Sequence, residues 1–139
     1  MTLSIRNRLN GTVIDVAAGE AMAAVKVRLD GGQVVTAAVT ADAVEELNLA
    51  KGSPVRALIK STEVSLATEP VTGLSIRNQL PGTVTDVALG QAMARVNVDA
   101  EGSRLTAAIT RDSAVELGLS PGSSVTVLIK STEVALDTV

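Results

Sequence analysis

The sequence predicts a mainly β protein made of two tandem small barrels, each with one short helix. Three observations support this prediction. The chain of 139 residues contains no Phe, Tyr or Trp, so its core must come from Val, Ala, Leu, Ile and Met. Val and Ile favour strands. One unit of roughly 65 residues is present twice, and each unit has several short strand-like runs with room for only one helix.

The internal repeat is visible by direct comparison. LSIRN at residues 3–7 recurs at 74–78, an offset of 71, and LIKSTEV at 58–64 recurs without change at 128–134, an offset of 70. The single missing residue lies between DGGQ at 30–33 and AEGS. Because a turn tip tolerates a deletion, this position is expected to be a turn.

The stretch ATEPVTG, which ends at Gly73, contains Pro, Gly and Thr and is typical of a short linker. We therefore expect a first domain at residues 1–67, a linker at 68–73 and a second domain at 74–139.

The strands of the first unit follow from its local pattern. Residues 3–7 are expected to be short and extended, and residues 11–18 and 21–29 form two strand-like runs separated by Gly19-Glu20, a tight hairpin turn. In the second run apolar and polar residues alternate, which indicates a sheet with one wet face. A third run covers residues 34–39.

A short helix is expected next. Thr40 is placed as its N-cap, and Asp42 puts negative charge in the first turn, where the helix dipole favours it. Asn48 stands where the chain leaves the helix, and its counterpart is Gly118. Both residues tolerate the left-handed conformation of a helix C-terminus.

The last main strand is expected at residues 55–59 and again at 125–129. Three strands, a helix and then further strands are compatible with an OB-like fold. A barrel of this size can be filled by aliphatic side chains alone.

The composition excludes several classes of function. Without Cys or His the chain has no thiolate nucleophile, no Ser-His-Asp triad and no common transition-metal ligand set. We therefore expect a protein that is not an enzyme, with no metal cation and no redox cofactor. The lack of aromatic rings and the net charge of −3 argue against nucleic-acid binding.

The sequence also predicts where the protein works. MTLSIRNRLNG contains no long apolar segment, so no secretory signal is expected. No stretch approaches about 20 consecutive apolar residues, so no membrane span is expected. A soluble, cytoplasmic protein is the resulting prediction.

One set of polar side chains is identical in the two units while charges elsewhere change, as when Lys26 becomes Asn97 and Glu20 becomes Gln91. All members of the set can donate hydrogen bonds. They are Ser4, Arg6, Asn7, Lys60, Ser61 and Thr62, with Ser75, Arg77, Asn78, Lys130, Ser131 and Thr132.

Such a set suits the capture of a small oxyanion, which needs converging N–H and O–H groups and one or two fixed charges. Backbone N–H groups at the turn after Lys60 could add to it, whereas Glu63 must point away or pair with Arg. An alternative reading remains open. A Ser-Thr pair after a strand commonly makes local turns with its own backbone, and the chain would then be a regulatory or protein-interaction module without a ligand.

The ordered segments SIRN, GTV, GEAMAAV, VTADAVEELNL and LIKSTEV resemble the Mop (molybdenum-pterin-binding, or molbindin) domain, which is grouped with TOBE domains. The resemblance covers both units, and the family's SARN motif reads SIRN in each. Two fused copies with no other domain look like the two-domain molbindins, which are cytoplasmic.

The resemblance implies a function, a site and an assembly. It implies molybdate or tungstate binding without chemical change, for storage or homeostasis, at domain interfaces of a homotrimer that forms a six-domain ring. The Lys-Ser-Thr segments match the family's oxyanion site, and the Ser-Arg-Asn residues match its N-terminal signature, with Arg and Asn able either to touch the anion or to brace the interface. The turns at Gly19 and Gly90 are further candidates through their backbone N–H groups.

Overall fold

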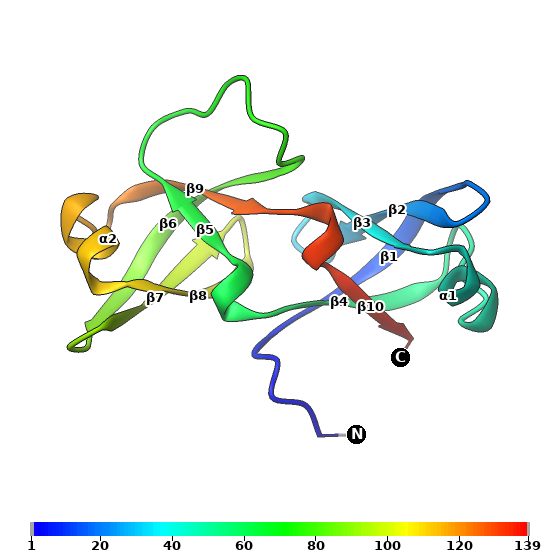
Figure 1. Cartoon of the computed structure of the whole chain (residues 1–139), viewed down its shortest axis with the longest axis horizontal. Helices are drawn as coiled ribbons and strands as arrows, with labels where there is room; N and C mark the ends of the chain where they lie inside the picture. The colour runs from blue at the N-terminus through cyan, green and yellow to red at the C-terminus, as the bar shows by residue number, and fades with distance from the viewer. Residues whose placement is uncertain (1, 139) are drawn as a thin grey trace.

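The computed structural model describes residues 2–138, which form ten strands, two α-helices and two single turns of 3-10 helix (Figure 1). The first repeat contains β1 (Asn7–Ala18), β2 (Met22–Leu29), β3 (Val34–Thr40), α1 (Ala41–Glu46), β4 (Pro54–Ile59), η1 (Ser61–Glu63) and β5 (Ser65–Ala67). The second contains β6 (Asn78–Leu89), β7 (Met93–Ala100), β8 (Ser103–Thr110), α2 (Arg111–Glu116), β9 (Ser124–Ile129), η2 (Ser131–Glu133) and β10 (Ala135–Thr138). The prediction of a mainly β chain with one short α-helix per repeat is confirmed.

The first strand is longer than the sequence pattern indicates. It begins at Asn7 rather than at residue 11, and a β-bulge lies between Val13 and Asp15. Gly11 allows this long strand to approach its neighbour, because a β-carbon there would lie 2.6 Å from the carbonyl oxygen of Arg28. A side chain at this position would push β1 away from β2.

The ends of the two α-helices agree with the predicted caps. The side chain of Thr40 accepts a hydrogen bond from the Ala43 N–H, and Thr110 does the same in the second repeat. Asn48 has φ +51° and Gly118 has φ +62°, the left-handed conformation that stops each helix. Neither helix is long and apolar enough to cross a membrane, a finding that covers residues 2–138.

The core is aliphatic and continuous across both repeats. Val25, Val27 and Val35 are fully buried and belong to the same cluster as Val96 and Ile129 of the second repeat. Alternate residues of the strands supply it, as the pattern of β7 shows. The two repeats therefore share one hydrophobic interior.

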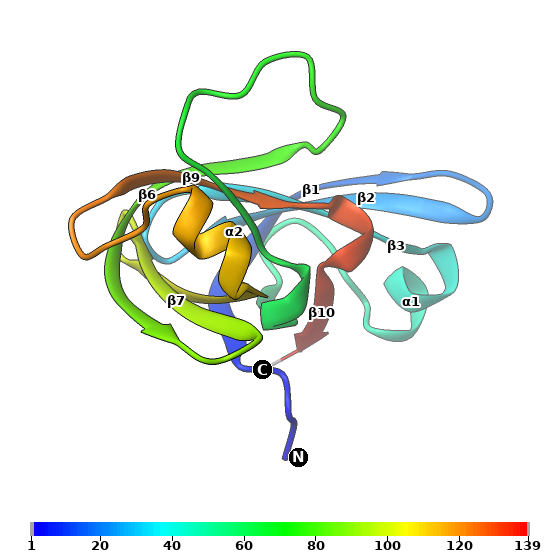
Figure 2. The same cartoon turned by 60° about the vertical axis from the view of Figure 1, so that its left-hand side comes forward.

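The sheets show why the interior is shared. Their strand orders are β10-β4-β1-β2-β3 and β5-β9-β6-β7-β8, so each repeat contributes its last strand to the sheet of the other. Ala135 of β10 pairs with Leu58 of β4, and Ser65 of β5 pairs with Leu128 of β9. This exchange cannot be inferred from the repeat pattern. Between β5 and β6 the linker projects from the body as a loop (Figures 1 and 2).

An ion pair fixes one of the exchanged strands. The Nε atom of Arg56 in β4 donates to Oδ1 of Asp137 in β10 at 3.0 Å, and a second bond joins the same two side chains. The hydrogen bond to Asp137 raises the pKa of Arg56 above its usual value. The matching positions in the second sheet hold Thr126 and Ala67, so this pair anchors β10 alone.

Two buried asparagines join the repeats at a second place. The Nδ2 atom of Asn7 donates to the Thr106 carbonyl at 2.9 Å, and the Thr106 N–H donates to Asn7 Oδ1 at 2.8 Å. Asn78 makes the same two bonds to Thr36 of the first repeat, at 2.9 and 2.8 Å. Each asparagine is only 3% exposed, so each side chain acts as a backbone-like bridge between the repeats.

Replacing Asn7 by Ala is expected to destabilise the protein by about 2 kcal/mol or more, because two hydrogen bonds are lost and the Thr106 backbone groups are left unpaired. Urea unfolding measures this change. The matched control is N10A, at an exposed asparagine of the same strand, which should cost less than about 0.5 kcal/mol. Equal stabilities of N7A and N10A would contradict the bridging role.

Candidate functional site

The strand register brings the predicted donors of the second repeat together. Asn78 pairs with Ile129, so the residues just beyond this pair, Arg77 and Lys130, leave the ladder side by side. A cavity of about 250 Å³ opens there. Its lining residues are Ser75, Ile76, Arg77, Lys130, Ser131 and Thr132.

The first repeat has the same strand register, because Asn7 pairs with Ile59 next to Lys60. Arg6 donates from Nε to the Ser4 carbonyl at 3.1 Å and from Nη2 to the Leu3 carbonyl at 2.9 Å.

Arg77 makes the equivalent bonds to Ser75 at 3.3 Å and to Leu74 at 3.0 Å. Each guanidinium is thus held in place by the backbone before it. Its remaining N–H groups stay free to bind a ligand.

The Lys-Ser-Thr segments do not continue the strands that precede them. Each forms one 3-10 turn, closed in the first repeat by the Glu63 N–H bonding to the Lys60 carbonyl at 3.0 Å. Turn η1 packs against β8 of the second repeat, and η2 packs against β3 of the first. The strand exchange causes this packing, since each turn lies on the path from one sheet to the other.

This packing buries two hydroxyl groups. The Oγ atoms of Ser61 and Ser131 are inaccessible to solvent and have no hydrogen-bond partner within residues 2–138. A buried polar group without a partner costs about 1–3 kcal/mol, so each of the two hydroxyls could hydrogen-bond a group that is brought to it. Lys60 and Lys130 beside them are exposed and carry the positive charge. Gln33 also has buried, unpartnered polar atoms, but it lies at the β2–β3 turn, and its amide offers both a donor and an acceptor.

The two Lys-Ser-Thr segments also approach one another. Because β10 pairs with β4, the end of η2 lies next to the end of β4, and a cavity of about 320 Å³ there is lined by Lys60, Thr132 and Glu133 among others. Two salt bridges occur in the described part of the chain, Arg56–Asp137 and Arg95–Asp86. Glu63 and Glu133 take part in neither.

Other predicted residues lie outside the second-repeat cavity. Asn7 and Asn78 use their side-chain amides to bridge the repeats. The N–H groups of Gly19 and Gly90 donate to the carbonyls of Met22 and Met93, each at 2.8 Å, and close hairpins at the two ends of the molecule (Figure 1). Within one chain, these glycines are not brought to the Lys-Ser-Thr turns.

One basic residue is missing from the predicted donor set, because that set contains only side chains that are identical in the two repeats. Arg8 occupies the position of Gln79, and its guanidinium donates to the Leu3 carbonyl beside that of Arg6. Its spacing of two residues from Arg6 could have indicated that both side chains lie on the same face of an extended segment.

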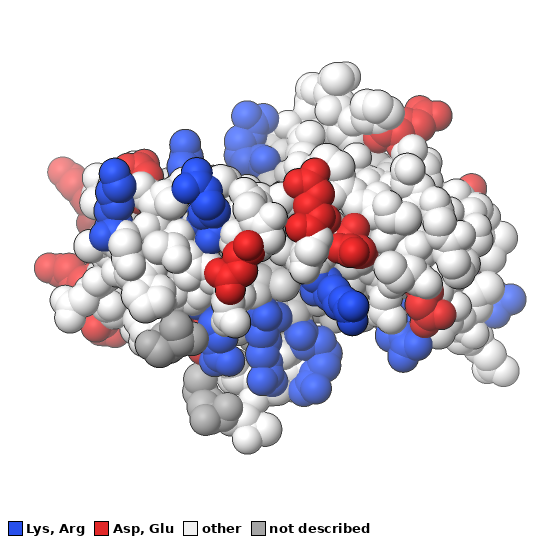
Figure 3. Space-filling view, turned by 180° about the vertical axis from the view of Figure 1, so that it is seen from behind, with Lys and Arg blue, Asp and Glu red and all other residues white. Residues whose placement is uncertain are grey.

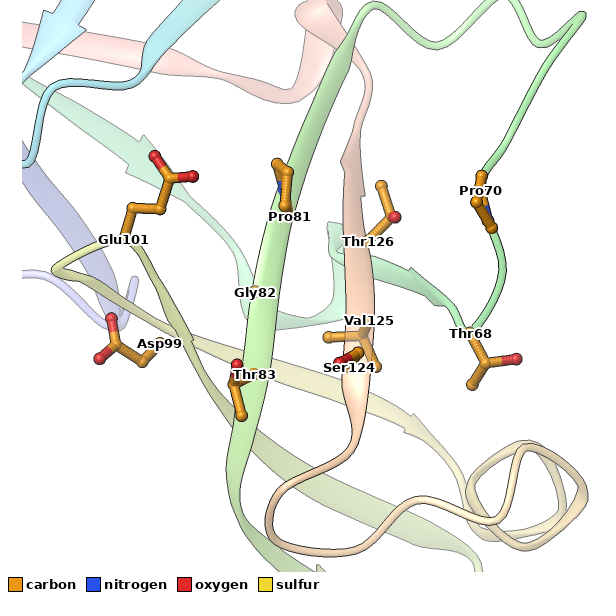
Figure 4. A pocket seen from close by; sticks show the side chains of 10 residues that line it. All are labelled: Thr68, Pro70, Pro81, Gly82, Thr83, Asp99, Glu101, Ser124, Val125 and Thr126. Atoms are coloured by element: carbon orange, nitrogen blue, oxygen red, sulfur yellow. The ribbon is translucent and has the colours of Figure 1, made fainter.

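A separate cavity of about 610 Å³ lies between the linker and strands β6 and β9 (Figure 4). Thr68 and Pro70 border it on one side, and Asp99 and Glu101 lie on the other. Its charged groups are carboxylates, which repel an anion, so this cavity does not fit the ligand that the basic residues would bind.

Comparison with known proteins identifies close relatives. The TOBE domain model matches residues 3–66 and 74–136. The molybdenum-pterin-binding protein MopB of Rhodobacter capsulatus is 44% identical over 135 residues, which cover 96% of this chain and 50% of MopB. The molybdenum transport protein ModE of Azotobacter vinelandii is 38% identical over 137 residues, 98% of this chain and 51% of ModE. The chain thus spans about half the length of these curated relatives.

A solved structure matches over the full length. The cytoplasmic molybdate-binding protein ModG, in a crystal form with molybdate bound, superposes with a TM-score of 0.96 at 36% identity, covering 100% of both chains. This chain therefore has the overall fold of a solved protein along its whole length.

Replacing Ser61 and Ser131 by Ala is expected to leave the stability of the ligand-free protein unchanged or slightly higher, because neither hydroxyl makes a hydrogen bond. The matched control is S53A, which removes a 3.0 Å bond from the Ala50 N–H to Ser53 Oγ and should cost about 1 kcal/mol. Thermal and urea unfolding compare the variants. A loss in S61A/S131A larger than in S53A would show that these hydroxyls have structural partners.

Proposed function

The chain belongs to the TOBE-domain family, and from this premise we propose that it is a cytoplasmic protein that binds molybdate for storage or homeostasis, without chemical conversion. The anion would sit at the Lys-Ser-Thr turns, held by Lys60, Ser61 and Thr62 and by their second-repeat counterparts. Ser4 and Arg6, with Ser75 and Arg77, would complete the two sites.

The observation that carries the proposal is the pair of buried, unpartnered hydroxyls of Ser61 and Ser131. Each lies beside a lysine, and the second-repeat cavity adds Arg77 and Ser75 from the segment that precedes β6. No carboxylate lines that cavity. An oxyanion would accept a hydrogen bond from the unpartnered serine hydroxyl. It would also neutralise the positive charge of the neighbouring lysine and arginine.

The donor set fits molybdate better than other common oxyanions. Molybdate is a fully deprotonated dianion at neutral pH, so it needs donors only. Phosphate carries a proton and would require an acceptor as well. Sulfate has the same charge and must be rejected by its smaller size, whereas tungstate is nearly the size of molybdate and should bind comparably.

The relatives support the same ligand. ModG is described as a molybdate-binding protein, and its molybdate-bound form has the fold and length of this chain. MopB, at 44% identity, carries molybdenum-pterin binding in its name. A pterin would lack a partner of the usual kind in this chain, because there is no aromatic ring on which it could stack.

We further propose that three chains assemble into a ring of six repeats. The ends of both long hairpins expose large apolar side chains, with Met22 at 48%, Leu89 at 49% and Met93 at 47% exposure. Exposed apolar groups at the two extremities of an elongated chain favour association. Contacts between neighbouring chains would cover them.

Titration calorimetry with molybdate tests the binding. The wild-type protein is expected to bind, and K60A/K130A to bind about 10- to 100-fold more weakly, since each site loses a charge-assisted bond of about 1.5–3 kcal/mol. Circular dichroism should show that the variant stays folded, because both lysines are exposed.

Sulfate and phosphate serve as controls for this titration, and tungstate should give a heat similar to that of molybdate. Absence of heat from the wild-type protein with molybdate would refute the proposed function. Full affinity in K60A/K130A would move the site away from the Lys-Ser-Thr turns.

Light scattering tests the assembly. A mass three times that of the 14.1 kDa chain is expected, and M22E/M93E should reduce it, because buried charges would destabilise the contacts between chains. A monomer of 14.1 kDa in the wild-type protein would refute the ring.

A further inference from the structure

Two arginines of the first repeat converge on a single backbone oxygen. Arg6 Nη2 donates to the Leu3 carbonyl at 2.9 Å, and Arg8 Nη2 donates to the same oxygen at 2.6 Å. Arg6 precedes β1 and Arg8 is its second residue, and the two exposed side chains flank the buried Asn7. The two positive charges are therefore next to each other, and the strand register places Arg6 next to Lys60, because Asn7 pairs with Ile59.

The second repeat keeps one of the two backbone hydrogen bonds of Arg8 but not its charge. Gln79 occupies the equivalent position, and its Nε2 atom donates to the Ile76 carbonyl at 3.0 Å. Arg8 makes the corresponding bond from Nε to the Ile5 carbonyl, also at 3.0 Å. Both repeats thus keep the bond to the carbonyl three residues earlier, and they differ in one positive charge and in the bond from Arg8 to the Leu3 carbonyl.

Within residues 2–138 neither Arg6 nor Arg8 has a carboxylate partner. The salt bridges within residues 2–138 are Arg56–Asp137 and Arg95–Asp86. Figure 3 shows basic side chains gathered at the lower edge of the rear face, the edge from which the N-terminal segment emerges in Figure 1. Adjacent like charges without a counter-ion are unfavourable, so an anion bound nearby would relieve the repulsion.

The outer sheet surfaces beside the two sites also differ. Arg6 lines a cavity of about 510 Å³ together with Asp99 and Arg104, whose charges oppose each other. The matching positions of the first repeat hold Arg28 and Val34. These residues influence which of the two sites binds the anion more tightly. Arg8 adds a positive charge to the first site alone.

We propose that Arg8 is a third cation of the first-repeat oxyanion site, and that it makes this site chemically different from the second. The inference rests on the proposed function and specifies how one of the two sites is tuned. A unit charge at the distance of a neighbouring guanidinium strengthens dianion binding by roughly three- to tenfold at low ionic strength, and the effect decreases as salt screens it.

Calorimetry with molybdate measures the affinity of each site separately, in variants that retain only one of the two sites. In the K130A/S131A background, which retains the first site, R8Q is expected to weaken binding by roughly three- to tenfold at low salt and by clearly less at about 0.5 M salt. In the K60A/S61A background, which retains the second site, Q79R is expected to tighten binding by a similar factor. Gln is the matched replacement, because Gln79 shows that it keeps the bond to the carbonyl three residues earlier.

Two further variants separate charge from anchoring. K51Q removes one positive charge at a different turn. The next residue in that turn, Gly52, donates to the Val13 carbonyl in the middle of β1. K51Q should therefore leave the affinity unchanged. R8M removes both the charge and the backbone bond. If R8Q binds like K51Q while R8M is weakened, Arg8 acts only as an anchor and the inference is overturned.

The outcomes also distinguish this inference from the proposed function. If the wild-type protein gives no heat with molybdate, the function itself fails. If the wild-type protein binds and R8Q in the single-site background binds equally well at low salt, only the role of Arg8 fails.

Discussion

The structure depends on the reciprocal exchange of the last strand of each repeat. Because β5 joins the second sheet and β10 joins the first, the Lys-Ser-Thr turns that precede them must cross from one sheet to the other. Each turn then packs against a strand of the opposite repeat. This packing buries Ser61 Oγ and Ser131 Oγ, so the chain connection that unites the core also builds the candidate sites.

The electrostatics of the sites are local and oppose the net charge of the chain, which is −3. At short range, converging donors in a partly desolvated place outweigh a distant and screened negative field. The backbone carbonyls of Leu3 and Leu74 hold the guanidinium groups of Arg6 and Arg77 next to the turns. Orientation is thus supplied by the main chain, and the lysine and serine side chains remain available to a ligand.

The repeats are similar in backbone and different in charge. The asparagine bridges from Asn7 and Asn78 are nearly identical in geometry, and both repeats stop their helices with a left-handed residue. The Arg56–Asp137 pair and Arg8 occur in the first sheet only. Duplication therefore supplied two copies of one scaffold, and substitution on the exposed faces made the environments of the two sites unequal.

The sequence by itself determined the mainly β class, the repeat, the helix caps and the donor set of the candidate sites. It could do so because strand propensity, capping and hydrogen-bond chemistry are properties of neighbouring residues. Only the tertiary structure decided which sheet receives β5 and β10, because either pairing satisfies the same local pattern. It also assigned Asn7 and Asn78 to bridging and left the hydroxyls of Ser61 and Ser131 buried without partners, since both outcomes depend on contacts with residues far away in the chain.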